Sequence, residues 1–147
     1  MKWICVLVWG AAALAGPAEY QAQFVGGTIP KISARSQTYL DFGGSEALLL
    51  RSSQTEMRIP YRRINTLEYG QNVSRRYAEA ILISPVLLLA KSRKHFVTIG
   101  YLDDSDQQQA IVLRVSKGDI RSVLASLEAR SGRRIEYQDA EARKAGR

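Results

Sequence analysis

Positively charged side chains occur in short clusters along the chain, and these are the residues best suited to bind a partner. Lysine and arginine outnumber aspartate and glutamate by 21 to 14, giving a formal net charge of +7. Arginine offers a planar fork of donors and lysine a point charge, and both suit phosphate or carboxylate groups. The predicted anion-binding residues are Arg62, Arg63, Arg75, Arg76, Lys91, Arg93 and Lys94. The alternative interpretation is ordinary surface charge.

An apolar run at residues 80–90, AILISPVLLLA, lies between two of these clusters and has Ser84 as its one polar residue. Eleven residues cannot span a bilayer, which takes about 20 in a helix. A hairpin kinked at Pro85 could instead enter the membrane surface, with the flanking cations at headgroup level. The predicted membrane-contact residues are Ile83, Val86, Leu87, Leu88 and Leu89. The alternative is that the run packs across an open end of a sheet as part of the core.

Groups that could catalyse a reaction are scarce in this sequence. His95 is the only histidine, and no nucleophile or carboxylate is spaced in the sequence to act with it. Cys5, the only cysteine, lies in an apolar N-terminal run. The acidic stretch 103–106 fails as a calcium loop, because Gln108 and Arg114 stand where an EF-hand needs glycine and glutamate. We therefore expect a non-catalytic protein without cofactor or metal, with a carboxylate-only or substrate-assisted enzyme as the disfavoured alternative.

The N-terminus has the three parts of a secretory signal peptide. Lys2 supplies the positive charge, residues 3–14 are apolar, and Ala13 and Ala15 form a small-x-small cleavage pattern. We expect cleavage after Ala15, within a signal region of residues 1–20, and export to the periplasm or cell exterior. An uncleaved N-terminal anchor is the alternative. In an exported protein, positive charge favours anionic lipid headgroups, cell-wall polymers or acidic proteins over nucleic acid.

Short strands and one helix are expected to position these groups. Residues 21–36 contain glycine and proline with little periodicity, which predicts a linker. Four antiparallel strands in a meander are predicted at 38–42, 46–51, 56–61 and 63–69, with a bulge near Asn65 and Thr66. A hairpin over 95–115 carries apolar residues on both faces, so we expect it near the centre of the sheet.

A closing helix is the clearest element of the pattern. Ile120, Val123, Leu124 and Leu127 follow helical spacing and form one apolar stripe. Gly132 provides the left-handed residue that commonly ends a helix. Ser116 and Asp119 have the spacing of a capping box at its start, and residues 135–137 predict a short final strand.

This order of elements is similar to that of pleckstrin-homology-like (PH-like) domains. Residues 57–64, MRIPYRRI, resemble the I-P-Y-x-x-I turn of bacterial PH-like and GRAM-like domains. Residues 92–101 and 119–133 resemble a group of uncharacterised exported bacterial proteins, which has no established activity to transfer. The resemblance covers roughly residues 37–137. It implies an α+β fold in which a C-terminal helix closes a curved antiparallel sheet, or partial barrel, of six to seven strands.

The expected organisation is a signal peptide at 1–20, a linker at 21–36, a PH-like domain at 37–137 and a flexible tail at 138–147. The expected function is a non-catalytic binding module of the bacterial cell envelope, with a protein or an anionic lipid as partner. The alternative function is a peripheral domain that inserts residues 80–90 into a membrane.

Overall fold

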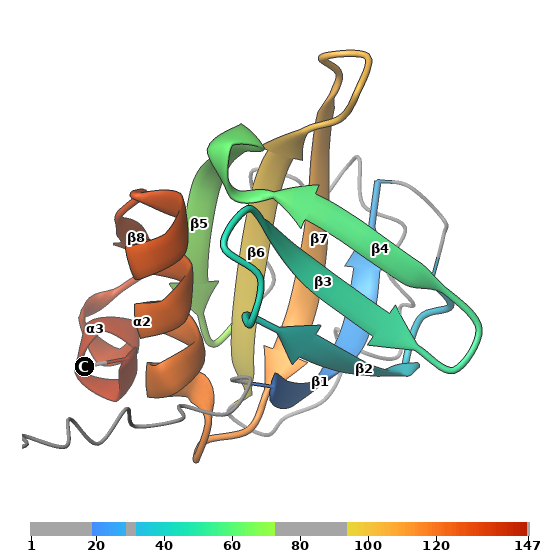
Figure 1. The fold of residues 1–147 in the computed structure, drawn as a ribbon. Coiled ribbons are helices and arrows are strands. Elements are labelled where there is room, and N and C mark those ends of the chain that lie inside the picture. Colours follow the sequence, from blue (N-terminus) through green and yellow to red (C-terminus); the bar gives the residue numbers. More distant parts are fainter. Residues whose placement is uncertain (1–18, 29–31, 73–93, 147) are drawn as a thin grey trace, which may run out of the picture.

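A computed structural model describes residues 19–28, 32–72 and 94–146 of the chain (Figure 1). In this part the fold is α+β, with an open, mostly antiparallel sheet of eight strands and two helices. The strands are β1 (Glu19–Gly27), β2 (Gln37–Asp41), β3 (Ala47–Ser52), β4 (Glu56–Pro60), β5 (Ile64–Gly70), β6 (His95–Leu102), β7 (Gln108–Val115) and β8 (Ile135–Tyr137). The helices are α2 (Ile120–Ser131) and α3 (Ala140–Gly146), and the 3-10 turn η1 (Tyr61–Arg63) joins β4 to β5.

The strands follow one another across the sheet in the order β4-β3-β2-β1-β7-β6-β5-β8. Strands β3 and β4 run across the direction of β6 and β7, so the sheet bends around its inner face (Figure 1). Helix α2 lies beside β5, with α3 next to it (Figure 1). The expected curved α+β sheet is therefore present, but the sheet has more strands than the predicted six to seven.

The core fills the inner face of the bent sheet, and α2 contributes its predicted stripe to it. Ile120, Val123, Leu124 and Leu127 are all at most 2% exposed and belong to one cluster with residues of the sheet. The helix ends at Gly132 as predicted, with φ at 69° and its N–H donating to the Glu128 carbonyl at 2.9 Å. These observations confirm the closing helix.

The β6–β7 hairpin is buried on both faces, as its sequence predicts. Val97 and Leu113 pair directly across the two strands and belong to the core of the inner face. Thr98 and Val112 pair at the next position, on the opposite face, and are at most 2% exposed. Strands of this kind belong in the middle of a sheet, and β6 and β7 do lie there.

The predicted four-strand meander is wrong in its last step. Strands β2, β3 and β4 pair in sequence, but η1 turns the chain away and β5 pairs with β6 and β8 on the other side of the sheet. Arg63 fixes this turn, because its Nη1 donates to the Asp103 carbonyl at 2.6 Å and to Asp106 Oδ1 at 2.9 Å. The register of β5 against β6 shifts between Ile64 and Thr66, which confirms the predicted bulge.

The linker predicted at residues 21–36 is also wrong over its first part. Residues 21–27 belong to β1, which pairs with β2 on one side and β7 on the other. Tyr20, Ala22 and Phe24 point to the core, whereas Gln21 and Gln23 point away from it. This alternation is the signal of a strand, and the glycines and proline that follow it obscured the pattern.

The predicted flexible tail contains a helix instead. Asp139 Oδ1 accepts a hydrogen bond from the Ala142 N–H at 2.6 Å, which is the geometry of an N-cap at the start of α3. Ala142 is fully buried in the core. At the other end, Gly146 lies so close to the Tyr137 and Leu124 side chains that an added Cβ would be 2.8 Å from Tyr137 Cε1. The segment is therefore docked onto β8 and α2.

Candidate anion-binding site

Three of the predicted anion-binding residues lie in the described part of the chain, and the structure separates them. The others, Arg75, Arg76, Lys91 and Arg93, lie outside the described residues, and so do the predicted membrane-contact residues Ile83, Val86, Leu87, Leu88 and Leu89. Arg63 precedes β5 and Lys94 precedes the antiparallel β6. The two residues therefore lie at opposite ends of these strands, roughly 26 Å apart at about 3.3 Å per residue.

Arg62 and Arg63 also differ from each other, although they are adjacent in sequence. Arg63 is engaged with Asp106 and the Asp103 carbonyl, so it serves the fold. Arg62 is exposed and lines a hollow of ≈ 520 Å³ together with Arg58 and Arg130. Glu46 lies in the same hollow and binds Arg58 at 3.4 Å, which offsets part of its positive charge.

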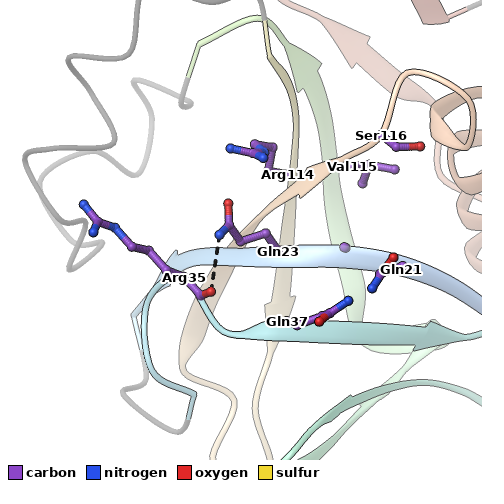
Figure 2. A pocket seen from close by; sticks show the side chains of 8 residues that line it. Gln21, Gln23, Arg35, Gln37, Arg114, Val115 and Ser116 are labelled. Carbon is purple, nitrogen blue, oxygen red and sulfur yellow. Dashed lines mark hydrogen bonds between the residues drawn. The ribbon is translucent and has the colours of Figure 1, made fainter.

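A groove on the outer face of the sheet gathers a different set of polar side chains (Figure 2). Its volume is ≈ 390 Å³, and its walls come from β1, β2, β7 and the loop before β2. Among the described residues, the lining contains two arginines, three glutamines and a serine but no carboxylate; these residues are Gln21, Ala22, Gln23, Arg35, Gln37, Arg114, Val115 and Ser116. We call this the outer-face groove. Two other hollows, the one at Arg62 and one beside α2, each include a glutamate.

Strand register explains why the groove forms from residues distant in sequence. Gln23 in β1 stands directly opposite Arg114 in β7 and Gln37 in β2. Side chains at paired positions point to the same face, and neighbouring strands are about 4.8 Å apart. Arg114, Gln23 and Gln37 thus form a row of hydrogen-bonding groups across three strands.

Arg35 brings a second guanidinium to the end of this row. Its backbone is left-handed, with φ at 71°, and its N–H donates to the Phe24 carbonyl at 2.8 Å. Its own carbonyl accepts a hydrogen bond from Gln23 Nε2 at 3.3 Å (Figure 2). The backbone contacts hold Arg35 against β1, and its side chain remains exposed.

The groove has unused capacity for hydrogen bonding. Within the described residues, neither Arg35 nor Arg114 has a carboxylate within 4.0 Å. Gln23 Oε1 is buried and finds no hydrogen-bond partner in the same part of the chain. Two acids of the same strands, Glu19 and Asp41, both bind Arg51, at 3.0 and 3.1 Å. The groove therefore presents free positive charge and suits a carboxylate or a phosphate.

Sequence reasoning missed the groove because it treated residues 21–36 as a linker. Gln21 and Gln23 are two residues apart, which places them on one face of a strand. The alternation in this stretch was the available signal. The pairing of Gln23 with Arg114, 91 positions later in the chain, had no local signature.

His95, the residue considered for catalysis, makes a structural contact. The Tyr69 hydroxyl and His95 Nδ1 form a hydrogen bond, and the two rings are stacked. Burial lowers the pKa of His95 below its ordinary value of 6.5, and the Lys117 ammonium lowers it further. Burial also raises the pKa of Tyr69, with smaller effects in the same direction from Tyr137 and Asp139. The pair thus favours a neutral imidazole beside a protonated phenol.

This contact predicts a pH dependence of stability. The pKa of His95 is lower in the folded state than in the unfolded state, so the unfolded chain binds a proton more readily. The contribution of neutral His95 to the free energy of unfolding is present above about pH 6.5, and it is lost as the pH falls toward the folded-state pKa. We expect His95→Gln, which keeps a hydrogen-bonding group near Tyr69, to lose less stability than the parent between pH 8 and pH 5. Urea unfolding at both pH values measures this, and equal losses in the two proteins would contradict it.

The acidic stretch considered for calcium closes the β6–β7 hairpin. Asp103 Oδ1 accepts the backbone N–H groups of Ser105 and Gln107, each at 2.9 Å, and Oδ2 accepts from Gln109 Nε2 at 2.8 Å. These hydrogen bonds, led by the one from Gln107, lower the pKa of Asp103. Among the residues that the structure describes, no group of three His, Cys, Asp or Glu side chains could hold a metal ion.

Comparisons with known proteins give no identification. No protein-family model matches the chain, and a search of curated proteins finds no match. None of the helices in residues 19–28, 32–72 and 94–146 is both long and apolar enough to cross a membrane.

Proposed function

We propose that this protein is a non-catalytic binding module of the bacterial cell envelope whose partner carries carboxylate or phosphate groups. The observation that carries the proposal is the outer-face groove, where Arg35 and Arg114 lie among three glutamine side chains, with no carboxylate among the described residues that line it. Charge-assisted hydrogen bonds from guanidinium groups are the strongest that such a surface can offer to a ligand. The signal-like N-terminus supports the envelope as the compartment.

The arrangement of elements supports a PH-like interpretation of the domain. Strands β1 to β7 pair antiparallel with their neighbours, and α2 follows them and packs on the inner face. In this interpretation β1 is the seventh strand of a PH-like sheet, in addition to the four strands predicted over residues 38–69 and the two of the hairpin. The parallel β8 is an addition at the edge.

Arg114→Gln tests this function directly. It removes one guanidinium from the β7 end of the row but leaves a side chain that can form hydrogen bonds. Two probes are compared: a labelled oligomer of glutamate, which carries carboxylates, and vesicles of phosphatidylcholine with phosphatidylglycerol, which carry phosphates. The probe that the parent binds more tightly identifies the class of partner. For whichever the parent binds, the variant should bind about tenfold more weakly, since one charge-assisted contact contributes about 1.5 kcal/mol.

Arg121→Gln is the matched control. It removes the same charge from an exposed position of α2, on the side of the sheet opposite the outer-face groove. Its binding should equal that of the parent within a factor of about two, the effect expected of a distant surface charge. Equal weakening by both variants would mean that binding depends on net charge and not on the groove, and absence of binding to either probe would overturn the proposal.

A further inference from the structure

Tyr39 lies on β2 next to the outer-face groove and offers an aromatic ring, which the polar side chains of the groove do not have. It is the only large hydrophobic side chain among the described residues that is exposed, at 42%. Its neighbours Thr38 and Leu40 point to the core, so Tyr39 lies on the same face as Gln37. Its direct partners across the strands are Gln21, which lines the groove, and Arg51 in β3.

Two rows of side chains therefore lie next to each other on this face. One row contains Arg114, Gln23 and Gln37, and the other contains Gln21, Tyr39 and Arg51. The rows are two residues apart along the strands, about 7 Å, and the groups within a row are about 4.8 Å apart. The spacing of about 4.8 Å between neighbouring groups within a row is close to the length of one hexose residue in an extended glycan chain.

The composition of the two rows matches a sugar acid better than a peptide or a simple ion. A carboxamide carries both donors and an acceptor, as a sugar hydroxyl does, so glutamines can pair with hydroxyl groups in either sense. The C–H bonds on the face of a sugar ring can pack on the electron-rich face of an exposed tyrosine. Arg114 and Arg35 would bind the carboxylates.

A peptide cannot bind to this surface by adding a strand to the sheet. An added strand needs a free sheet edge, and the edges of the described sheet are β4 and β8. Strands β7, β1 and β2 all lie inside the sheet, so their backbone groups are already paired. Recognition here must come from side chains alone.

We propose that the outer-face groove binds an acidic polysaccharide, with one sugar residue over each of β7, β1 and β2 and the ring face of one sugar on Tyr39. This inference rests on the proposed function, because it names the ligand class of the same groove.

The test compares three ligands by isothermal titration calorimetry: an oligogalacturonate, an oligomer of glutamate and neutral maltohexaose. The parent should bind the oligogalacturonate most tightly. Tyr39→Ala should weaken that binding three- to tenfold and leave binding of the glutamate oligomer unchanged. Tyr39→Phe, which keeps the ring, should bind like the parent. Arg114→Gln should weaken binding of both acidic ligands, and thermal unfolding of each variant establishes that it is folded.

The outcomes separate this inference from the function on which it rests. If both acidic ligands bind equally and Tyr39→Ala changes neither, the glycan inference is overturned and the anion-binding function stands. If maltohexaose binds as tightly as the oligogalacturonate and Arg114→Gln has no effect, the anion-binding function is overturned. If none of the three ligands binds, the glycan inference is overturned, and the anion-binding function is overturned with it if the phosphatidylglycerol vesicles are not bound either.

Discussion

Replacing Leu127 by aspartate is expected to abolish the cooperative unfolding of this protein. The Leu127 side chain is fully buried and is the last member of the stripe by which α2 packs on the sheet. Removing such a leucine alone costs about 2–5 kcal/mol, and burying a carboxylate without a partner adds more. A domain of this size has a free energy of unfolding of about 5–15 kcal/mol. Val123→Asp should act in the same way, because Val123 is equally buried.

Urea unfolding followed by far-ultraviolet circular dichroism measures this loss. Ser122→Asp is the matched control, because Ser122 is exposed on the same helix, near its N-terminus, where a negative charge is tolerated. The control should unfold like the parent. If Leu127→Asp and Val123→Asp also unfold like the parent, α2 is not packed against the sheet in the way described.

Helix α2 and the β6–β7 hairpin could be predicted because the sequence pattern of each lies within the element itself. The stripe of α2 repeats within two turns, and the end of the helix depends on one residue, Gly132, with a positive φ. Each strand of the hairpin is likewise a mostly buried run within its own eight residues. Patterns that are complete within one element can be found without knowing its neighbours.

Pairing between strands could not be found in this way. The alternation of β5 is the same whether it lies next to β4 or at the far side of the sheet. The choice is made by η1 and by Arg63, whose partners Asp103 and Asp106 lie 40 and 43 positions along the chain. Such long-range contacts leave no local signature, so the meander was extended by one strand too many.

The same limit applies to the binding site. Arginines adjacent in sequence, such as Arg62 and Arg63, were expected to act together, yet one lines a hollow and the other holds a turn. Arg114 was not selected, because nothing next to it in sequence is basic. Its role follows only from its place opposite Gln23. Clusters of charge along a chain and clusters in space are different things in a sheet protein.

A chain that begins at Gln37, the predicted start of the domain, is expected not to fold. It lacks β1, which lies between β2 and β7 and is the only described strand that pairs with both halves of the sheet. Its removal leaves the edges of both neighbours unpaired and takes Ala22, Phe24 and Val25 from buried positions. Burying these groups contributes several kcal/mol, at about 25 cal/mol per Å² of apolar surface, which is comparable to the whole stability.

The truncated chain can also be used to test the position of β1 directly. Thermal unfolding should show no cooperative transition for residues 37–147, whereas a chain that lacks only residues 1–15 should keep the transition of the parent. A synthetic peptide of residues 19–28 should restore the transition when added in excess, because it can insert between the open edges of β2 and β7. The same peptide with Phe24→Asp should not, since Phe24 is 2% exposed and lies in the core. A truncated chain that unfolds cooperatively without the peptide would show that the two halves of the sheet do not need β1.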